Sequence, residues 1–373
     1  HGPPLLPARS GGVPEHATLV EALRHTAAAC GADRGITYVT GGAATHESYA
    51  GLLREARRLH CGLRRLGLRP REPVALQILD SRMHIRALWA CAVGGLPSLT
   101  VAVAPQLTPS NAVAAKLVAA VAQLGARHVL ASDELAAPLR ALLPRAEVLA
   151  VARLEEAATA AAPLPDQLPE ELPGPAASDV LFYQLTSGST GVPKVIPETH
   201  AAVIHHIRST AQGCAALPGE ETSLNWLPFD HVVPILTYHF ADAYLGRAAV
   251  QLPTDEVIAD PLAWLRSLAA HRVTHSWSPN FGFKLAASAL REGGLDATAA
   301  RESLGDLSCV RRLMNAGEQV TAAVCDAFLS LTGLPSEVMQ PAFGMAETAT
   351  CMAYASLYGG SDSSALVLTE SLA

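Results

Sequence analysis

The order of apolar and polar positions along the chain alternates between helical and extended spacing. Helical spacing of apolar residues predicts amphipathic helices at residues 18–30, 48–67, 110–124, 200–212, 260–271 and 322–332. Short apolar runs between them predict buried strands at residues 73–79, 98–103, 127–131, 180–185 and 273–277. Because strands and helices follow each other in turn, the pattern predicts an α/β fold with two doubly wound sheets of parallel or mixed strands, each flanked by helices.

Changes in composition along the chain indicate four segments. Residues 1–13 lack the pattern of a signal peptide and are interpreted as a flexible leader or a cloning remnant. An N-terminal α/β subdomain is expected at residues 14–153. Residues 154–177 are rich in Ala, Pro and Glu and are expected to form a surface connector. A second α/β subdomain is expected at residues 178–373.

Composition and charge exclude several classes of partner. The chain has 50% apolar and 16% charged residues over 373 positions, which is enough for a large core. A formal net charge of −7 without basic runs argues against nucleic-acid binding. The longest apolar stretch, residues 87–103, contains two glycines and a proline and is too interrupted to span a membrane. Seven scattered cysteines without a CxxC pair suggest reduced thiols in a cytoplasmic protein with no zinc site.

A glycine- and hydroxyl-rich stretch, LTSGSTGVPK at residues 185–194, follows the strand predicted at 180–185. Glycines bring backbone N–H groups close to an anion, hydroxyls add donors, and Lys194 adds a positive charge, so the stretch can wrap phosphate. It is not a Walker loop, because Gly188 and Gly191 are too close together and Lys194 is followed by Val195. A solvated Ser/Gly linker is the alternative. The chain has only three lysines, which favours a specific role for Lys194.

The stretch TSGSTGVPK resembles the phosphate loop of the adenylate-forming superfamily, which includes acyl-CoA synthetases and the adenylation domains of nonribosomal peptide synthetases. Two later stretches, NAGE at 315–318 and FGMAET at 343–348, are similar to the next two core motifs of that superfamily, in the same order. Within the superfamily, the segments LPFDHV and SWSPNFGF are most similar to ligase domains that load carboxylic acids at the front of polyketide synthases and hybrid assembly lines.

This resemblance implies a set of residues that bind ATP and Mg²⁺. The expected nucleotide ligands are Thr186, Ser187, Gly188, Ser189, Thr190, Gly191, Lys194, Gly317, Glu318, Ala342, Phe343, Gly344 and Thr348. Glu347 is the expected magnesium ligand, and a solvated loop glutamate is its alternative interpretation. Phe343 is expected to stack on adenine, with a core phenylalanine as the alternative. Many superfamily members have a hydroxyl residue where this chain has Ala346, and Thr348 is a candidate replacement.

The resemblance also implies a pocket for the acid. Its expected residues are Phe229, Asp230, His231, Trp277, Asn280, Phe281, Ala316, Gly317 and Met345. In amino-acid-activating members an aspartate after phenylalanine pairs with the substrate ammonium, and Phe229-Asp230 has that order. The surrounding LPFDHV is closer to ligases in which a histidine, here His231, lies near the substrate carboxylate. An unpaired aspartate beside an apolar acyl chain is costly. We favour an acid without an amino group and keep both possibilities open.

The expected activity is that of an AMP-forming acid–thiol ligase, with Lys194, Glu347 and His231 as catalytic residues. The acid and ATP would give acyl adenylate and pyrophosphate, and the acyl group would pass to the phosphopantetheine of an acyl carrier protein or to CoA. Only 26 residues follow Glu347, so the C-terminal lid of the superfamily is expected to be absent and the fragment to be impaired. The alternatives are an amino-acid-activating adenylation domain, a non-catalytic acyl-binding module and an unrelated phosphate-binding NTPase.

Overall fold

A computed structural model describes residues 13–160, 174–186, 194–213, 219–294, 297–354 and 358–359. The chain divides into two compact units, each described by itself. The first comprises His1–Tyr38, Thr45–Gly219 and Pro228–Arg247, and the second comprises Val39–Ala44, Glu220–Leu227 and Ala248–Ala373. Within the described ranges, no helix is both long enough and apolar enough to cross a membrane.

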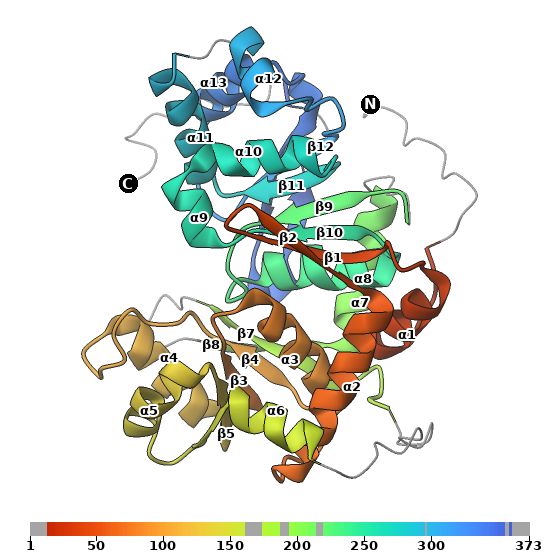
Figure 1. Cartoon of the computed structure of the whole chain (residues 1–373), viewed down its shortest axis with the longest axis vertical. Helices are drawn as coiled ribbons and strands as arrows, with labels where there is room; N and C mark the ends of the chain where they lie inside the picture. The colour runs from red at the N-terminus through yellow and green to blue at the C-terminus, as the bar shows by residue number, and fades with distance from the viewer. Residues whose placement is uncertain are drawn as a thin grey trace. The chain divides into compact units, whose positions relative to one another are not determined.

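The first unit is built on a six-stranded sheet with the strand order β6-β5-β3-β4-β7-β8 (Figure 1). Its strands are β3 (Val74–Gln77), β4 (Ser98–Thr100), β5 (His128–Ala131), β6 (Glu147–Ala150), β7 (Val180–Thr186) and β8 (Lys194–Thr199). Its helices are α1 (Leu19–Ala29), α2 (Tyr49–Arg65), α3 (Ser81–Val93), α4 (Ala112–Leu124), α5 (Asp133–Leu142), α6 (Val151–Thr159), α7 (His200–Gly213), α8 (Ala241–Leu245) and the π-helix η1 (Val233–Phe240). All neighbouring strands are parallel except β8, which runs antiparallel to β7 at the edge.

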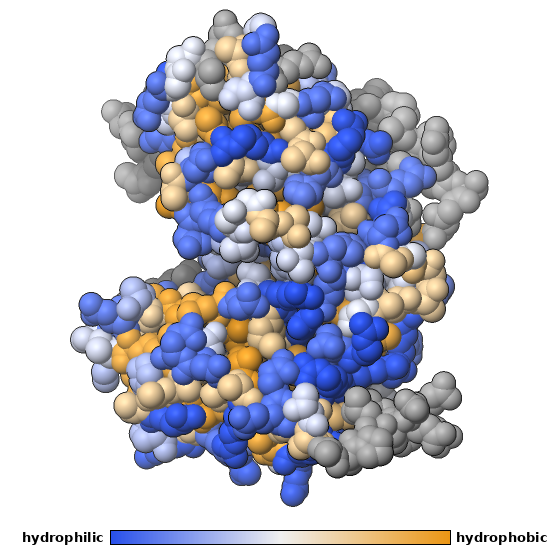
Figure 2. Space-filling model, viewed as in Figure 1, coloured by the Kyte–Doolittle hydropathy of each residue, from blue (hydrophilic) through white to orange (hydrophobic). Residues whose placement is uncertain are grey.

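Helices cover both faces of this sheet, as expected for strands that are apolar on both sides. On one face, Leu117 of α4 and Leu139 of α5 are fully buried in one core with Leu99 and Val129 of the strands. Helices α2, α3 and α6 lie on the other side, and Gly62 of α2 allows the close approach of α6 (Figure 1). Hydrophilic side chains gather over α2 on the surface (Figure 2), which fits the amphipathic pattern of its sequence.

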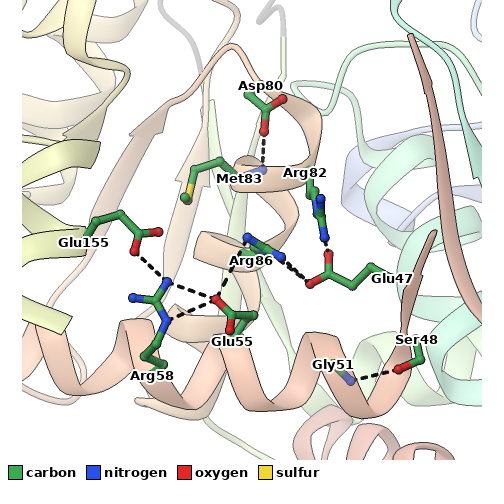
Figure 3. A network of polar contacts seen from close by, with 10 residues as sticks. All are labelled: Glu47, Ser48, Gly51, Glu55, Arg58, Asp80, Arg82, Met83, Arg86 and Glu155. Carbon is green, nitrogen blue, oxygen red and sulfur yellow. Dashed lines mark hydrogen bonds and ion pairs between the residues drawn. The ribbon is translucent and has the colours of Figure 1, made fainter. Parts of the chain in front are cut away.

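A buried polar network holds the helices on that side together (Figure 3). Glu47, whose side chain is only 3% exposed, accepts hydrogen bonds from Arg82 at 3.2 Å and from Arg86 at 2.8 Å. A second carboxylate, that of Glu55, lies between Arg58 and Arg86, and Arg58 also pairs with Glu155 of α6 at 2.6 Å. Because these charges are largely shielded from water, each depends on its partners.

The second unit contains most of an eight-stranded sheet with the strand order β14-β13-β12-β11-β9-β10-β1-β2. Its strands are β9 (Thr222–Asn225), β10 (Ala248–Gln251), β11 (His275–Ser278), β12 (Arg312–Asn315), β13 (Met339–Gly344) and β14 (Cys351–Tyr354), and the hairpin of β1 (Gly35–Thr40) and β2 (Ala43–Ser48) contributes its tip. Its helices are α9 (Thr254–Ala259), α10 (Pro261–Ala270), α11 (Asn280–Glu292), α12 (Ala297–Leu304) and α13 (Ala322–Thr332), with the short 3-10 turns η2 (Ser336–Val338) and η3 (Ala346–Thr348). Strands β9 to β13 pair in parallel, and β14 is antiparallel to β13.

These observations confirm the predicted α/β class with two mixed sheets flanked by helices. The predicted cap of α2 is also confirmed, because the Ser48 hydroxyl accepts a hydrogen bond from the Gly51 N–H at 3.1 Å. Several short elements were not predicted, namely β2, α5, β6, β9, η1, α8, β10, α9, α12, η2, η3 and β14. Strand β2 escaped prediction because its outer residues are mostly exposed and polar, so no apolar alternation marks it.

The units also differ from the predicted segments. Residues 154–159, assigned to a connector, lie in helix α6, where Leu154 is fully buried against α2. The reason is that its apolar residues follow helical spacing, which the Ala- and Glu-rich composition obscures. Residues 161–173 of the expected connector, and the leader at residues 1–12, lie outside the described ranges. Strands β7 and β8 belong to the first unit because β7 pairs with β4 of the first sheet and β8 pairs with β7.

Candidate active site

The predicted phosphate loop connects the two strands of an antiparallel hairpin. Strand β7 ends at Thr186 and β8 begins at Lys194, and these two residues are a directly opposed cross-strand pair. Lys194 is exposed and, within the described part of the chain, forms no ion pair. Ser187, Gly188, Ser189, Thr190 and Gly191 lie outside the described residues, so their assignment as phosphate ligands stays a prediction.

The loop Phe229–His231, here called the acid loop, belongs to the same unit as this hairpin. Gln184 of β7 donates a hydrogen bond from Nε2 to the backbone oxygen of Asp230 at 2.8 Å. The Asp230 side chain is 18% exposed, and its Oδ2 lies 3.9 Å from Nε2 of the mostly exposed His231. Its Oδ1 is buried and has no hydrogen-bond partner among the described residues. Burial raises the pKa of the Asp230 carboxyl, and nearby His231 offsets part of that rise.

Behind the acid loop, two buried histidines enclose the ring of Phe229. His84 of α3 stacks on that ring with centroids 5.4 Å apart, and His239 of η1 meets it edge-on at 6.1 Å. His239 Nε2 accepts a hydrogen bond from the Trp89 indole N–H at 2.7 Å, which fixes its ring. Burial lowers the pKa of His84 to about 4 and that of His239 to about 3, so both rings are neutral at pH 7. Phe229 is therefore anchored in the core behind the loop.

Sequence reasoning did not find Gln184, His84 or His239. A signal for Gln184 was present, because a lone amide in the apolar strand VLFYQLT must find a partner if it is buried. His239 has a comparable signal, a histidine within the apolar run 232–240. The partners themselves are 46 and 150 residues away in the chain, at Asp230 and Trp89, and no local pattern reveals them.

In the second unit, the NAGE loop is tied to the start of helix α11. Glu318 accepts a hydrogen bond at Oε1 from the backbone N–H of Phe281 at 2.6 Å, within the first turn of α11. Asn280 Oδ1 accepts from Asn315 Nδ2 at 3.2 Å and from the Thr321 N–H at 3.3 Å. One carboxylate oxygen of Glu318 thus accepts a hydrogen bond from the N-terminal turn of α11, where a negative charge is favourable.

Gly317 and its neighbours follow strand β12, at the carboxyl end of a parallel strand. Gly317 has a φ of +89°, which favours glycine, and a Cβ there would lie 3.9 Å from the ring of Trp277. Ala316 and Trp277 are buried, and the Trp277 indole N–H donates to Asn225 Oδ1 at 3.2 Å. Ligands of open α/β sheets bind at this edge, and the assignment of these residues to an acid pocket stays a prediction.

The FGMAET motif lies on the β13–β14 hairpin and presents its side chains outward. Phe343 is 61% exposed and Met345 is 43% exposed, so the alternative of a core phenylalanine at 343 is wrong. Gly344 permits the close pairing of the two strands, because a Cβ there would lie 2.1 Å from the Thr350 carbonyl oxygen. Half-buried Ala342 precedes them on β13.

Thr348 uses its hydroxyl inside the same turn. Its Oγ1 is 2.9 Å from the carbonyl oxygen of Met345 and 3.0 Å from that of Thr350, with the hydroxyl as donor. A hydroxyl has one proton, which is shared between these two acceptors. The role of Thr348 as a replacement for the hydroxyl missing at Ala346 stays a prediction, and an oxygen lone pair is the part of the group still free for it.

Glu347 is an exposed carboxylate on the turn η3. Among the residues that the structure describes, no cluster of three or more His, Cys, Asp or Glu could hold a metal ion. An exposed carboxylate is the kind of oxygen ligand that Mg²⁺ takes in nucleotide sites, where one or two carboxylates bind it together with substrate phosphates. The assignment of Glu347 as the magnesium ligand stays a prediction. Glu347 belongs to the second unit, whereas Lys194 belongs to the first.

Comparisons with known proteins identify the family. The family model described as AMP-binding enzyme matches residues 23–367. Aspulvinone E synthetase melA of Aspergillus terreus is 33% identical over 174 residues, which cover 46% of this chain and 18% of that protein. Nonribosomal peptide synthetase apvA of the same organism is 31% identical over 186 residues, 49% of this chain and 20% of that protein. The chain thus matches about a fifth of the length of these curated relatives.

Solved structures of adenylation domains resemble this chain over nearly its whole length. McyG A-PCP complexed with phenylalanyl-adenylate has a TM-score of 0.83 and 28% identity, covering 94% of this chain and 54% of that one. The adenylation domain of a keto acid-selecting NRPS module bound to keto acyl adenylate has a TM-score of 0.79 and 29% identity, covering 94% and 64%.

The relatives favour one branch of the superfamily over the branch named in the sequence analysis. The similar proteins above include nonribosomal peptide synthetases, and the polyketide loading domains expected from LPFDHV and SWSPNFGF have less support. The family model spans the phosphate loop, the acid loop, the NAGE loop and the FGMAET motif together. The chain therefore belongs to the AMP-binding enzyme family, as an adenylate-forming domain homologous to the adenylation domains of nonribosomal peptide synthetases.

Proposed function

We propose that this domain activates an α-keto carboxylic acid with ATP and passes the acyl group to the phosphopantetheine thiol of a carrier protein, within an assembly line of the nonribosomal-peptide type. In the first step, a carboxylate oxygen of the acid attacks the α-phosphorus of ATP. An oxygen–phosphorus bond forms to give acyl adenylate, and the bond to the bridging oxygen breaks and releases pyrophosphate. In the second step, the thiolate displaces AMP and a thioester forms.

The residues of this chain would act chiefly by binding and orienting charge. Lys194 and the N–H and hydroxyl groups of residues 186–191 would neutralise the β- and γ-phosphates. His231, exposed beside Asp230, would orient the substrate carboxylate for attack. The exposed Phe343 would stack on adenine. Mg²⁺, held by Glu347 and the phosphates, would supply charge neutralisation at the leaving pyrophosphate.

The environment of Asp230 is the observation that supports an acid without an amino group. Burial raises the pKa of its carboxyl, and His231 already lies beside one of its oxygens. Burial disfavours the charged form of this carboxyl, which makes it a weaker partner for an ammonium group. A structure similar to this chain, the keto acid-selecting module, binds a keto acyl adenylate.

An α-amino acid is the second candidate substrate. The observation that supports it concerns the other carboxylate oxygen of Asp230. Oδ1 of Asp230 is buried without a partner among the described residues, and a substrate ammonium would satisfy it. McyG, similar to this chain over 94% of its length, is complexed with phenylalanyl-adenylate. The two candidates differ only in the group at the α-carbon, so matched pairs of acids distinguish them.

The test is acid-dependent exchange of pyrophosphate into ATP, with each amino acid compared with its own keto acid, for example phenylalanine with phenylpyruvate. We expect exchange with keto acids to exceed that with amino acids. Asp230→Asn should leave keto-acid exchange within about threefold, because a keto acid has no ammonium group that needs the charge of Asp230. If the amino acid is the substrate, the same change removes its counter-ion and lowers exchange by about 100-fold or more.

Two results would contradict the enzymatic proposal itself. An absence of exchange with every acid in a broad panel would exclude acid activation. Calorimetry that shows acid binding with no effect of Mg-ATP would then favour a non-catalytic acyl-binding module. ATP hydrolysis that does not depend on any acid would favour a phosphate-binding NTPase.

A further inference from the structure

Gln184 connects strand β7, which leads to the predicted phosphate loop, with the acid loop. It is a residue of β7, two positions before Thr186, where the predicted phosphate loop begins. Its side chain is buried, and its amide Nε2 donates to the Asp230 carbonyl oxygen at 2.8 Å. The same nitrogen lies 3.4 Å from the carbonyl oxygen of Leu185, a longer contact. One amide therefore connects the strand leading to the phosphate loop with the backbone of the acid loop.

A buried amide is an unusual choice for this strand unless its hydrogen bond is needed. Leu181 and Phe182, earlier in the same strand, are apolar and buried, as expected for a strand that is covered on both faces. An apolar side chain of similar size at position 184 would avoid the cost of desolvating an amide. The amide is tolerated because it meets a carbonyl oxygen, and that carbonyl belongs to a loop and not to the sheet.

The rest of the acid loop is held in a different way. Its Phe229 ring is packed between His84 and His239, which fixes the side chain but leaves the following peptide to other contacts. The bond from Gln184 holds the backbone of the acid loop from a separate strand, and within the loop region a long bond of 3.5 Å joins the His231 N–H to the Pro228 carbonyl. The π-helix η1 begins directly afterwards at Val233, and π-helical turns are frequent beside functional sites.

We propose that Gln184 is a positioning residue that couples the binding of the two substrates. Its hydrogen bond fixes the Asp230 peptide relative to the β7–β8 hairpin, which leads into the predicted phosphate loop. The binding of ATP and the binding of the acid therefore depend on each other. This inference rests on the proposed function. Gln184 touches neither substrate in this account. It acts through Asp230 and His231, whose side chains are set by the peptide that the amide holds.

The coupling can be measured as a ratio of affinities. If ATP and the acid communicate through Gln184, the acid binds more tightly when the nucleotide is present, and the nucleotide binds more tightly by the same factor when the acid is present. Replacing the amide by an apolar side chain of similar length, Gln184→Met, removes the bond to Asp230 and should reduce this factor. The KM for the acid should rise, while the affinity for nucleotide alone stays close to that of the unmodified protein.

Gln77 provides a matched control. It is also a buried glutamine in a strand of the same sheet, and its Nε2 donates to a backbone oxygen, that of Val101, at 2.6 Å. Gln77→Met loses a hydrogen bond of the same kind from a position equally shielded from water. In the described contacts Gln77 does not reach the acid loop, so its replacement tests the purely structural cost of losing such a bond.

The experiment uses isothermal titration calorimetry with Mg²⁺ and α,β-methylene-ATP, which does not form an adenylate, and the acid that gives the strongest pyrophosphate exchange. We expect Gln184→Met to lower the affinity ratio by about fivefold to tenfold, the size expected for one hydrogen bond. Gln77→Met should leave the ratio unchanged within about twofold. Should Gln184→Met not fold, Gln184→Asn takes its place, since it keeps the amide but draws it back by one methylene group.

Each outcome has a separate meaning. A ratio that is unchanged in Gln184→Met, or reduced equally in Gln77→Met, would overturn the coupling role while leaving the proposed function standing. An absence of acid-dependent exchange in the unmodified protein would overturn the proposed function and this inference with it. A selective loss of the ratio in the Gln184 variants would support both.

Discussion

The two units present their expected site residues in opposite ways. In the first unit, two buried contacts hold the acid loop: a hydrogen bond from the Gln184 amide to the Asp230 carbonyl oxygen, and an aromatic stack on Phe229. In the second unit, the FGMAET turn leaves Phe343, Met345 and Glu347 exposed on a hairpin. The comparison indicates that contacts within the chain hold the acid loop, whereas the three side chains of the FGMAET turn are left open to solvent. Substitutions of the buried residues should therefore affect stability, and substitutions of the exposed residues should affect affinity.

The largest effect on activity is expected at Lys194, an exposed residue of the first unit. Lys194→Ala removes the positive charge expected beside the phosphates and should lower pyrophosphate exchange by about 100-fold to 1,000-fold. Because the side chain is exposed, the free energy of unfolding should change little. Lys284→Ala, another exposed lysine on α11, is the matched control. Equal kinetics in the two variants would remove the loop from the mechanism.

A large effect on stability is expected at Glu47 in the buried network of the first unit. Glu47→Gln leaves Arg82 and Arg86 without their charge partner in a site largely shielded from water, so the free energy of unfolding should fall by about 3 kcal/mol. Urea denaturation measures this change. Glu147→Gln, which affects a pair with Arg153 that is about half exposed, should cost less than about 1 kcal/mol. Similar losses in both variants would contradict the assigned importance of burial.

Acid should also destabilise the first unit through its neutral histidines. Burial lowers the pKa of His239 to about 3, below the value of about 6.5 in the unfolded chain. The unfolded state therefore takes up the proton first, and the stabilisation present above pH 6.5 is lost as the pH falls towards 3. At pH 5 this amounts to about 2 kcal/mol for one such histidine.

The histidine prediction is checked by urea denaturation at pH 7 and pH 5. His239→Gln keeps an acceptor for the Trp89 indole N–H but removes the titrating group. The variant should therefore lose about 2 kcal/mol less than the unmodified protein between the two pH values. Parallel pH profiles would show that His239 is already free to take up a proton in the folded state.

The smallest effect is expected at Phe343 in the second unit. Phe343→Ala should raise the KM for ATP by about fivefold to tenfold, because the stacking of one aromatic ring contributes about 1 kcal/mol. Since the ring is 61% exposed, the thermal midpoint should stay within about 2 °C. Phe283→Ala, a fully buried ring of the same unit, should instead lower stability by about 3 kcal/mol or more. A strong loss of stability at Phe343 would restore the core interpretation.

The sequence predicts the long elements of this fold well because their periodicity is strong. The helix capped by Ser48 and the buried strands of the first sheet fall close to their observed positions. Short elements escape because a strand such as β9, with four residues, carries too little pattern. The family motifs point to Lys194, Glu347 and Phe343, but they do not reveal Gln184 or His239, whose partners lie far away in the chain.

The antiparallel edge strand β8 has a consequence for solubility. An outermost strand displays unpaired N–H and C=O groups, which can recruit a strand from another molecule and begin aggregation. Pro197 lies in the middle of β8, opposite Tyr183, and is exposed. Because proline has no N–H to offer, it interrupts the row of donors along this border. This edge of the sheet, next to the predicted phosphate loop, is thus protected against pairing with a strand of another copy.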